Sequence, residues 1–355
     1  MTTASGDTRS RVLRVVEVRE ETEEAKSLVF AIPERDRELF SYRPGQFVTI
    51  RIPSDRTGSV ARCYSISSCP AEERLSVTVK RVDGGYGSNW LCDNVTAGTS
   101  LEVLPPSGAF TPRSLDGDFL LIGAGSGITP LLSITKAVLR CGTGKVTLFY
   151  ANRDEKSVIF RDELRELAVE HRERLTVLHW LESLQGMPHR TRLAPLLAPH
   201  VGAETYLCGP QPFMEQVRQA LAEHGAADGV HVEKFTSLSG DPFTERSPTP
   251  APASVTDSEA AGRAVSVIVG GEEHEIHWSP GSVLLDALLD EGVDVPFSCF
   301  DGECGTCRAE LVQGKVHMGR AEGLTEDEVE KGAILACVTE APDDSDPTRI
   351  VVRFP

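Results

Sequence analysis

Four cysteines near the end of the sequence have the spacing needed to hold an iron–sulfur cluster. Four residues separate Cys299 from Cys304, two separate Cys304 from Cys307, and twenty-nine separate Cys307 from Cys337. This is the plant-type spacing for a 2Fe–2S cluster, in which three thiolates converge from one loop and a fourth comes from another element. Glycines within the loop allow it to pass close to the cluster and to point amides at its sulfurs.

The alternatives are a structural zinc site and four unrelated thiols. Zinc sites usually combine two short pairs of cysteines or histidines, whereas Cys337 has no such neighbour in the sequence. We therefore predict that these four cysteines bind a 2Fe–2S cluster. The other cysteines lack this spacing, and most are expected to be small buried apolar side chains; they are Cys63, Cys69, Cys92, Cys141 and Cys208.

A second candidate site combines an arginine, a tyrosine and a serine with a glycine-rich turn. Residues 62–68 read Arg-Cys-Tyr-Ser-Ile-Ser-Ser; tyrosine can stack on a flavin ring, serine can hydrogen-bond near its N5, and arginine can pair with a phosphate. Residues 84–90, Gly-Gly-Tyr-Gly-Ser-Asn-Trp, run into a helix predicted over residues 89–92. The amides of this turn and Ser88 are suited to a pyrophosphate. Each run alone also fits an edge strand or a plain turn.

A third candidate site consists of two turns that each follow a predicted strand. Residues 123–130, Gly-Ala-Gly-Ser-Gly-Ile-Thr-Pro, open a helix. They do not match the Rossmann Gly-x-Gly-x-x-Gly fingerprint, but a tight turn at a helix N-terminus favours a phosphate. Residues 206–210, Tyr-Leu-Cys-Gly-Pro, place Cys208 at the carboxyl edge of the sheet, where α/β domains bind ligands. Each turn alone also fits an ordinary strand-to-helix connection.

Three sets of elements position these candidates. Up to about residue 112, short β-type runs separated by Gly, Pro and Asp indicate an antiparallel barrel or sandwich. From residue 119, strands alternate with helices, which is typical of an α/β domain with a parallel sheet. The first set comprises residues 12–18, 27–32, 47–52, 75–80 and 101–104. The second has strands at 119–122, 146–150, 176–180 and 204–208 and helices at 130–140, 162–170 and 212–223. Around the cysteines we predict strands at 264–269, 273–278 and 349–354 and a helix at 283–291.

A spacer and a change in charge set the last quarter of the sequence apart. Residues 247–262 are rich in Pro, Ala and Ser and lack apolar periodicity, so we predict an extended linker. Residues 1–262 carry 29 basic and 34 acidic side chains, whereas residues 263–355 carry 7 and 19. Of the formal net charge of −17, −12 therefore lies on the cysteine-bearing quarter. We expect either a solvated acidic face or a surface that docks a basic partner.

Composition narrows the possible functions. A chain of 355 residues with 40% hydrophobic residues has room for two or three domains with cores of their own. Its acidic balance argues against nucleic-acid binding and against attraction to an anionic membrane. Since no apolar run reaches 18 residues and no signal peptide is evident, we expect no membrane association. We predict a cytoplasmic location, where thiols stay reduced.

Taken in order, the motifs resemble those of the ferredoxin–NADP reductase superfamily. The C-terminal cysteines narrow this likeness to reductase components of multicomponent oxygenases, and most closely to those of 3-ketosteroid 9-alpha-hydroxylases. Reductases of phenylacetyl-CoA epoxidases are similar at a greater distance. The runs that carry the likeness are residues 62–65, 88–93, 123–130, 150–154, 177–186, 208–210 and 233–235.

The resemblance implies a multidomain fold. An antiparallel β-barrel (residues 9–112) would bind FAD, and an α/β domain with a parallel sheet (113–236) would bind the nicotinamide nucleotide. A linker (237–262) would lead to an α+β, β-grasp ferredoxin domain of the plant type (263–355).

The resemblance also implies roles for individual residues. Ser65 near flavin N5, Cys208 at the nicotinamide and Glu233, where the family closes over the flavin, are the expected catalytic residues. Arg62, Cys63, Tyr64, Ser65, Thr78, Lys80, Gly87, Ser88 and Phe235 are the expected flavin residues. Gly123, Gly125, Gly127, Thr129, Cys208, Gly209 and Pro210 are the expected nucleotide residues.

The implied function is electron transfer from NADH, through FAD and the 2Fe–2S cluster, to a separate terminal oxygenase of the Rieske type. A steroid hydroxylase is the expected partner, and a phenylacetyl-CoA epoxidase or an aromatic-ring dioxygenase is the alternative. NADPH remains possible because Arg153, which suits a 2′-phosphate, stands beside Asp154, which repels it; FAD is favoured over FMN by resemblance alone. A redox sensor without turnover is a competing class. A self-sufficient oxygenase is a third, but the sequence leaves no unassigned domain for a substrate pocket.

Overall fold

The computed structural model describes residues 10–55, 57–227, 229–235, 238, 242–243, 263–279, 281–297, 299–324, 326–342 and 349–354. The chain divides into two compact units, residues 1–235 and 236–355. All but three positions of the predicted linker, residues 237–262, lie outside the described residues.

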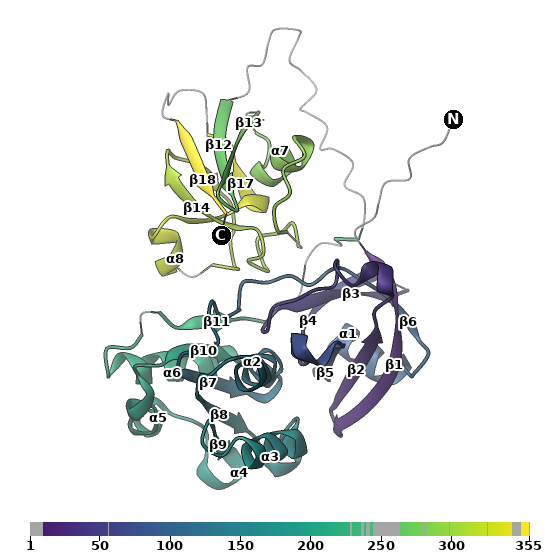
Figure 1. Ribbon diagram of the computed structural model, residues 1–355, viewed down its shortest axis with the longest axis vertical. Helices are drawn as coiled ribbons and strands as arrows, with labels where there is room; N and C mark the ends of the chain where they lie inside the picture. Colours follow the sequence, from purple (N-terminus) through teal and green to yellow (C-terminus); the bar gives the residue numbers. More distant parts are fainter. Residues whose placement is uncertain are drawn as a thin grey trace. The chain divides into compact units, whose positions relative to one another are not determined.

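The first unit begins with an antiparallel sheet of six strands in the order β4-β3-β6-β1-β2-β5 (Figure 1). A bridge between Ile66 and Val77 joins the end of β4 to β5 and closes the sheet into a barrel around an apolar core. The strands are β1 (Arg11–Thr22), β2 (Ala25–Ala31), β3 (Phe47–Ser54), β4 (Gly58–Ser65), β5 (Leu75–Lys80) and β6 (Ser100–Val103), with η1 (Glu34–Asp36), η2 (Pro70–Glu72) and α1 (Tyr86–Asn94) between them. The predicted barrel is confirmed. Strand β4 lies outside the strand runs predicted from periodicity, although the run at residues 62–68 also fits an edge strand.

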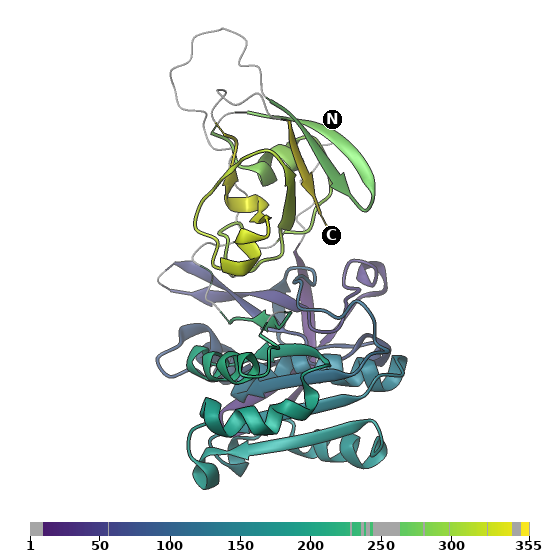
Figure 2. The ribbon, with the colours of Figure 1, turned by 90° about the vertical axis from the view of Figure 1, so that its left-hand side faces the viewer.

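The rest of the first unit is a parallel sheet in the order β11-β10-β7-β8-β9, with helices on both faces (Figures 1 and 2). Because side chains alternate along a strand, one face packs on α2 and α3 and the other on α5 and α6. The elements are β7 (Phe119–Ala124), η3 (Gly125–Gly127), α2 (Ile128–Cys141), β8 (Val146–Asn152), η4 (Glu155–Ser157), α3 (Arg161–Glu170), β9 (Leu175–Leu181), α4 (Glu182–Gln185), α5 (Arg190–Leu197), η5 (Ala198–His200), β10 (Glu204–Cys208), α6 (Gln211–Ala222) and β11 (His231–Glu233). The predicted α/β architecture is confirmed.

The second unit is an α+β domain built on a mixed five-stranded sheet, β13-β12-β18-β14-β16. The central pair β12 and β18 is parallel and the other pairs are antiparallel, while the apolar side of α7 joins the core of the sheet. The elements are β12 (Arg263–Val269), β13 (Glu272–Trp278), α7 (Leu284–Asp290), β14 (Arg308–Gln313), β15 (His317–Met318), α8 (Glu326–Glu330), β16 (Ala333–Leu335), η6 (Ala336–Val338), β17 (Thr339–Glu340) and β18 (Ile350–Arg353).

None of the helices in the described ranges has the length and apolar character that a membrane span requires.

Candidate functional site

The edge strand β4 carries four of the predicted flavin residues. The register of β4 against β3, with the alternation of side chains along a strand, puts Arg62 and Tyr64 on one face and Cys63 and Ser65 on the other. Ser65 is buried, and Nη1 of Arg62 donates to the backbone oxygen of the preceding residue at 2.6 Å. Burial raises the pKa of Tyr64, so its hydroxyl stays protonated.

The glycine-rich turn enters α1 at Tyr86, three residues earlier than predicted. Gly87 and Ser88 therefore lie in its first turn, where backbone amides have no partner within the helix. The Ser88 hydroxyl closes the turn by accepting a hydrogen bond from the Val82 amide at 3.0 Å. A Cβ at Gly87 would lie 2.9 Å from Cγ of Arg62. Amides and a guanidinium thus meet at one place, which fits the pyrophosphate of FAD.

The β7–α2 turn lies directly against the end of β10. Gly123 and Cys208 are register partners in the parallel β7–β10 pair. A Cβ at Gly127 would lie 2.2 Å from the carbonyl oxygen of Cys208 and 2.8 Å from the nitrogen of Gly209. The two predicted nucleotide turns are therefore packed backbone on backbone, and Pro210 leads from the second into α6. This close pair of turns at the carboxyl edge of the sheet fits a dinucleotide.

The same turn also approaches the barrel. A Cβ at Gly125 would lie 3.5 Å from Nζ of Lys80 on β5. Desolvation by burial, with a smaller contribution from the charge of Arg153, lowers the pKa of Lys80. Thr129, in the first turn of α2, donates to the carbonyl of Ser126 at 3.0 Å. The structure thus brings predicted flavin and nucleotide residues together.

Thr78 takes part in a buried chain of hydroxyls on the barrel. Its Oγ1 lies 2.8 Å from Oγ of Ser27 and 3.1 Å from Oγ of Ser67. Thr78 is thus fixed by neighbours on β2 and after β4, next to the strand that carries Ser65.

Tyr150 is a site residue that the sequence patterns missed. It is buried on β8, and its hydroxyl donates to the carbonyl of Gly125 at 3.0 Å. Tyr150 therefore holds the glycine turn in place. The available signal was a tyrosine near the end of an otherwise apolar strand.

Cys208 and Glu233 face each other across the β10–β11 pair. Burial raises the pKa of the Cys208 thiol, and the charge of Glu233 adds to this effect. Glu233 keeps a partly exposed side chain, yet protein atoms surround its carboxyl group, and this desolvation raises its pKa to about 8. Burial therefore favours the protonated form of both groups. Phe235, by contrast, is half exposed.

The raised pKa of Glu233 predicts a pH dependence of stability. Between pH 4.5 and about 8 the folded protein retains a proton that the unfolded chain has lost, so stability falls as pH rises through this window. We expect Glu233→Gln to raise the melting temperature relative to the wild type more at pH 8 than at pH 5. Thermal unfolding at both pH values measures this, with Glu38→Gln at an exposed carboxylate as the control. Equal shifts at both pH values would contradict the assignment.

The four cysteines predicted as cluster ligands come together in the second unit. Cys299, Cys304 and Cys307 lie in the loop between α7 and β14, and Cys337 lies in η6. The thiol of Cys299 contacts those of Cys304 and Cys337, and the thiol of Cys337 also contacts that of Cys307.

Backbone amides point at these sulfurs. The amide of Gly302 lies 3.2 Å from Sγ of Cys337, that of Cys304 lies 3.4 Å from Sγ of Cys299, and that of Cys337 lies 3.4 Å from Sγ of Cys307. Gly302 has a φ of +72°, and a Cβ there would lie 2.4 Å from the carbonyl oxygen of Arg320. Four converging thiols with amide donors fit a 2Fe–2S cluster. Within the described ranges, no three His, Cys, Asp or Glu side chains surround a position for a single metal ion.

Models of three known protein families match the chain. The model of the oxidoreductase FAD-binding domain matches residues 12–111, that of the oxidoreductase NAD-binding domain matches residues 121–219, and that of the 2Fe-2S iron-sulfur cluster binding domain matches residues 267–342.

Curated relatives match along nearly the whole chain. The chain is 54% identical over 332 residues, 93% of each chain, to the ferredoxin reductase component of 3-ketosteroid-9-alpha-monooxygenase from Rhodococcus rhodochrous. It is 50% identical over 342 residues, 94% of each chain, to the component of the same name from Mycobacterium tuberculosis. One component of the 1,2-phenylacetyl-CoA epoxidase of Escherichia coli is 32% identical over 342 residues, 92% of this chain and 93% of that protein.

Solved structures share the fold. Full-length CYP116B46 from Tepidiphilus thermophilus matches with a TM-score of 0.67 and 26% identity over 99% of this chain and 43% of that chain. Phthalate dioxygenase reductase matches with a TM-score of 0.56 and 24% identity over 97% of this chain and 98% of that chain. The chain is thus an oxidoreductase with FAD-binding, NAD-binding and 2Fe–2S domains, and it belongs to the family of the ferredoxin reductase components of 3-ketosteroid-9-alpha-monooxygenase.

Proposed function

We propose that this reductase passes electrons from NADH to a terminal oxygenase of the Rieske type that acts on a 3-ketosteroid. The observation that carries the proposal is identity of 50–54% to steroid monooxygenase reductases over more than nine-tenths of the chain. When bound, FAD accepts two electrons from NADH as a hydride, and the 2Fe–2S cluster passes them on one at a time. The protein supplies position, charge and exclusion of water.

In this proposal, Arg62 and the first turn of α1 would hold the FAD pyrophosphate, while Tyr64 and Ser65 would hold its ring. The packed turns at Gly127 and Cys208 would hold the nucleotide. Ser65, Cys208 and Glu233 remain the proposed catalytic residues. The other proposed cofactor residues are Cys63, Thr78, Lys80, Gly87, Ser88, Gly123, Gly125, Thr129, Gly209, Pro210 and Phe235, and the proposed metal ligands are Cys299, Cys304, Cys307 and Cys337.

The proposed domain boundaries are 9–112 for the flavin domain, 113–236 for the nucleotide domain, 237–262 for the linker and 263–355 for the ferredoxin domain. A cytoplasmic location is part of the proposal, because none of the nine cysteines pairs in a disulfide and a reducing compartment keeps thiols available as cluster ligands.

The contacts of Arg153 support a preference for NADH over NADPH. Its Nη2 lies 2.5 Å from Oε2 of Glu24 on the barrel, so the guanidinium is already paired, and Asp154 beside it repels a phosphate. We expect a higher kcat/KM for NADH than for NADPH. Glu24→Gln is expected to shift that ratio toward NADPH by about tenfold, because Arg153 gains freedom to bind a 2′-phosphate. Glu23→Gln, at the neighbouring exposed carboxylate, is the control, and an unchanged ratio in Glu24→Gln would contradict the role of Arg153.

The excess acidic charge of the ferredoxin domain predicts steering of the partner. With −12 on residues 263–355, we expect the second-order rate of electron transfer to the oxygenase to fall as salt is added. Stopped-flow measurements between low and high ionic strength test this, and reduction of ferricyanide serves as the control for the flavin half-reaction. If the rate of electron transfer does not depend on salt, the acidic face does not steer the partner and is only a solvated surface.

Reconstitution tests the function as a whole. The holoenzyme, NADH and a Rieske-type 3-ketosteroid 9-alpha-hydroxylase are expected to give hydroxylated steroid. A phenylacetyl-CoA epoxidase and an aromatic-ring dioxygenase are run in parallel. Product with either of these but not with the steroid enzyme would overturn the proposed partner, and failure of NADH to bleach the flavin would overturn the reductase function.

A further inference from the structure

One face of α2 joins the nucleotide domain to the chain segment that follows the flavin strand. Thr129, Ser133, Lys136 and Arg140 recur at helical spacing and so share one face of α2. Thr129 is a predicted nucleotide residue in the first turn, and the other three contact the barrel. The position of α2 against the barrel therefore sets where Thr129 and the glycine turn lie relative to Ser65.

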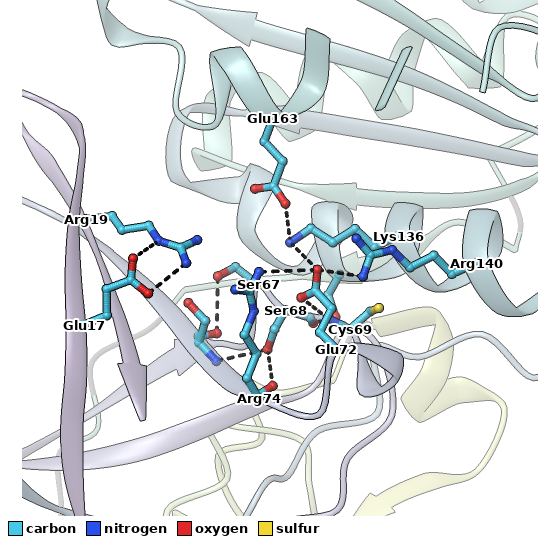
Figure 3. A network of polar contacts seen from close by, with 12 residues as sticks. Glu17, Arg19, Ser67, Ser68, Cys69, Glu72, Arg74, Lys136, Arg140 and Glu163 are labelled. Carbon is cyan, nitrogen blue, oxygen red and sulfur yellow. Dashed lines mark hydrogen bonds and ion pairs between the residues drawn. The ribbon is translucent and has the colours of Figure 1, made fainter. Parts of the chain in front are cut away.

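A carboxylate from the barrel is the centre of these contacts (Figure 3). The side chain of Glu72 in η2 is only 5% exposed, and its Oε1 lies 3.0 Å from Nη1 of Arg140, 3.5 Å from Nζ of Lys136 and 3.6 Å from Nη2 of Arg74. Its other oxygen accepts from the Cys69 amide at 3.1 Å. Glu72 is thus held on its own side by Arg74 and Cys69 and pairs with two cations of α2.

Lys136 joins three elements through one buried ammonium group. Its side chain is only 4% exposed, and its Nζ lies 2.7 Å from Oε1 of Glu163 on α3 as well as near Glu72. Figure 3 shows Glu163 and Glu72 approaching this group from opposite sides. Burying an ion pair costs desolvation free energy, so the pair adds little stability. Its geometry, however, favours one rotation and one axial position of α2 against its neighbours. An apolar side chain would tolerate more than one rotation of the helix.

A hydrogen bond between buried groups fixes the same register one turn closer to the nucleotide. Oγ of Ser133 donates to the carbonyl of Ser68 at 2.6 Å, and both residues are buried. Ser68 lies three residues after Ser65, and its own hydroxyl is fixed by Tyr42 at 2.7 Å. Ser133 and Lys136 thus hold α2 to one short segment, residues 68–72, that continues from the proposed flavin strand.

We propose that Lys136, with Glu72, Glu163 and Ser133, is a positioning device that sets the separation between the nicotinamide and the flavin. Lys136 touches neither group: it lies seven residues, or about 10 Å, along the helix from Thr129. Release of this contact lets α2 turn or slide, so NADH still binds but at a poorer distance for hydride transfer. A misplacement of about 1 Å can cost 100-fold in rate. This inference rests on the proposed function.

The test is anaerobic stopped-flow reduction of the holoenzyme by NADH. Lys136→Met is expected to slow flavin reduction about tenfold or more, to weaken the NADH–flavin charge-transfer absorbance and to change KM for NADH less than about threefold. Lys136→Arg restores the charge and should recover most of the rate. Glu163→Gln removes the negative charge from the 2.7 Å ion pair at a partly exposed residue and should show the same pattern in a milder form. It takes the place of Lys136→Met if that variant does not fold.

The control is Arg11→Met, which breaks an ion pair of the barrel, Nε of Arg11 to the buried Asp36 at 3.0 Å. If Lys136→Met and Glu163→Gln lower the melting temperature like Arg11→Met and leave the rate and the charge-transfer band unchanged, Lys136 is merely structural and the inference fails. An effect on KM alone would also overturn it. If NADH does not reduce the flavin of the wild-type protein, the proposed function itself is wrong. Failure of the proposed function can therefore be distinguished from failure of the inference about Lys136.

Discussion

Cys337→Ala is expected to abolish electron delivery to one-electron protein acceptors while leaving the flavin reaction intact. Cys337 is the one predicted ligand outside the loop of residues 299–307, and its thiol contacts those of Cys299 and Cys307. Without it, a plant-type cluster keeps three protein ligands and is not retained. We expect loss of the 2Fe–2S absorbance and electron paramagnetic resonance signal, and a fall of about 100-fold or more in NADH-dependent reduction of cytochrome c.

Ferricyanide reduction separates this effect from general damage. Ferricyanide takes electrons from reduced flavin, which belongs to the other unit of the chain, so this rate should stay close to that of the wild type. Cys141→Ala, at an exposed free cysteine of the nucleotide domain, should retain both activities. An intact 2Fe–2S spectrum in Cys337→Ala would remove Cys337 from the ligand set.

The sequence predicts the parts of this molecule whose chemistry depends on local spacing. The thiols of Cys299, Cys304 and Cys307 converge because the loop between them is short, and the glycine turn at residues 123–127 is recognisable from its own composition. Strand β4 was only an alternative interpretation of residues 62–68, because Arg62, Cys63, Tyr64 and Ser65 interrupt the apolar alternation that indicates a strand. We assign those same residues to the flavin. The apolar alternation is therefore interrupted at the positions where cofactor binding requires other side chains.

Contacts between elements that lie far apart in the sequence could not be predicted from it. Lys136 stands in a run of apolar residues on α2, and nothing nearby in the sequence indicates a partner for it. Glu72 lies 64 positions earlier in another domain, and the pairing becomes visible only once the barrel and the sheet are packed together. The same holds for Tyr150, whose hydroxyl meets a backbone carbonyl of the turn after the neighbouring strand. Such pairs follow from tertiary packing, which periodicity does not encode.

Gly127→Ala is expected to have the second large effect, by forcing the two nucleotide turns apart. Gly127 has a φ of −62°, which any residue adopts, so the backbone conformation itself tolerates alanine. The obstacle is space: the new Cβ would lie 2.2 Å from the carbonyl oxygen of Cys208 and 2.8 Å from the nitrogen of Gly209. Both atoms belong to the backbone of β10 and its following turn, so a side-chain rotation cannot relieve the contact.

A shift of about 1 Å at this point moves the nicotinamide site relative to the flavin. We expect kcat/KM for NADH to fall about 100-fold, whereas the 2Fe–2S spectrum, which depends on the other unit, stays that of the wild type. Gly202→Ala is the matched control, because it lies just before the same strand and a Cβ there meets nothing within 4 Å. Titration with NAD⁺, followed by flavin absorbance, reports whether the loss lies in binding or in the hydride step. If Gly127→Ala keeps the kcat/KM of the wild type, the backbone of β10 can shift without loss of activity. The close packing of the two turns would then not define the nucleotide site.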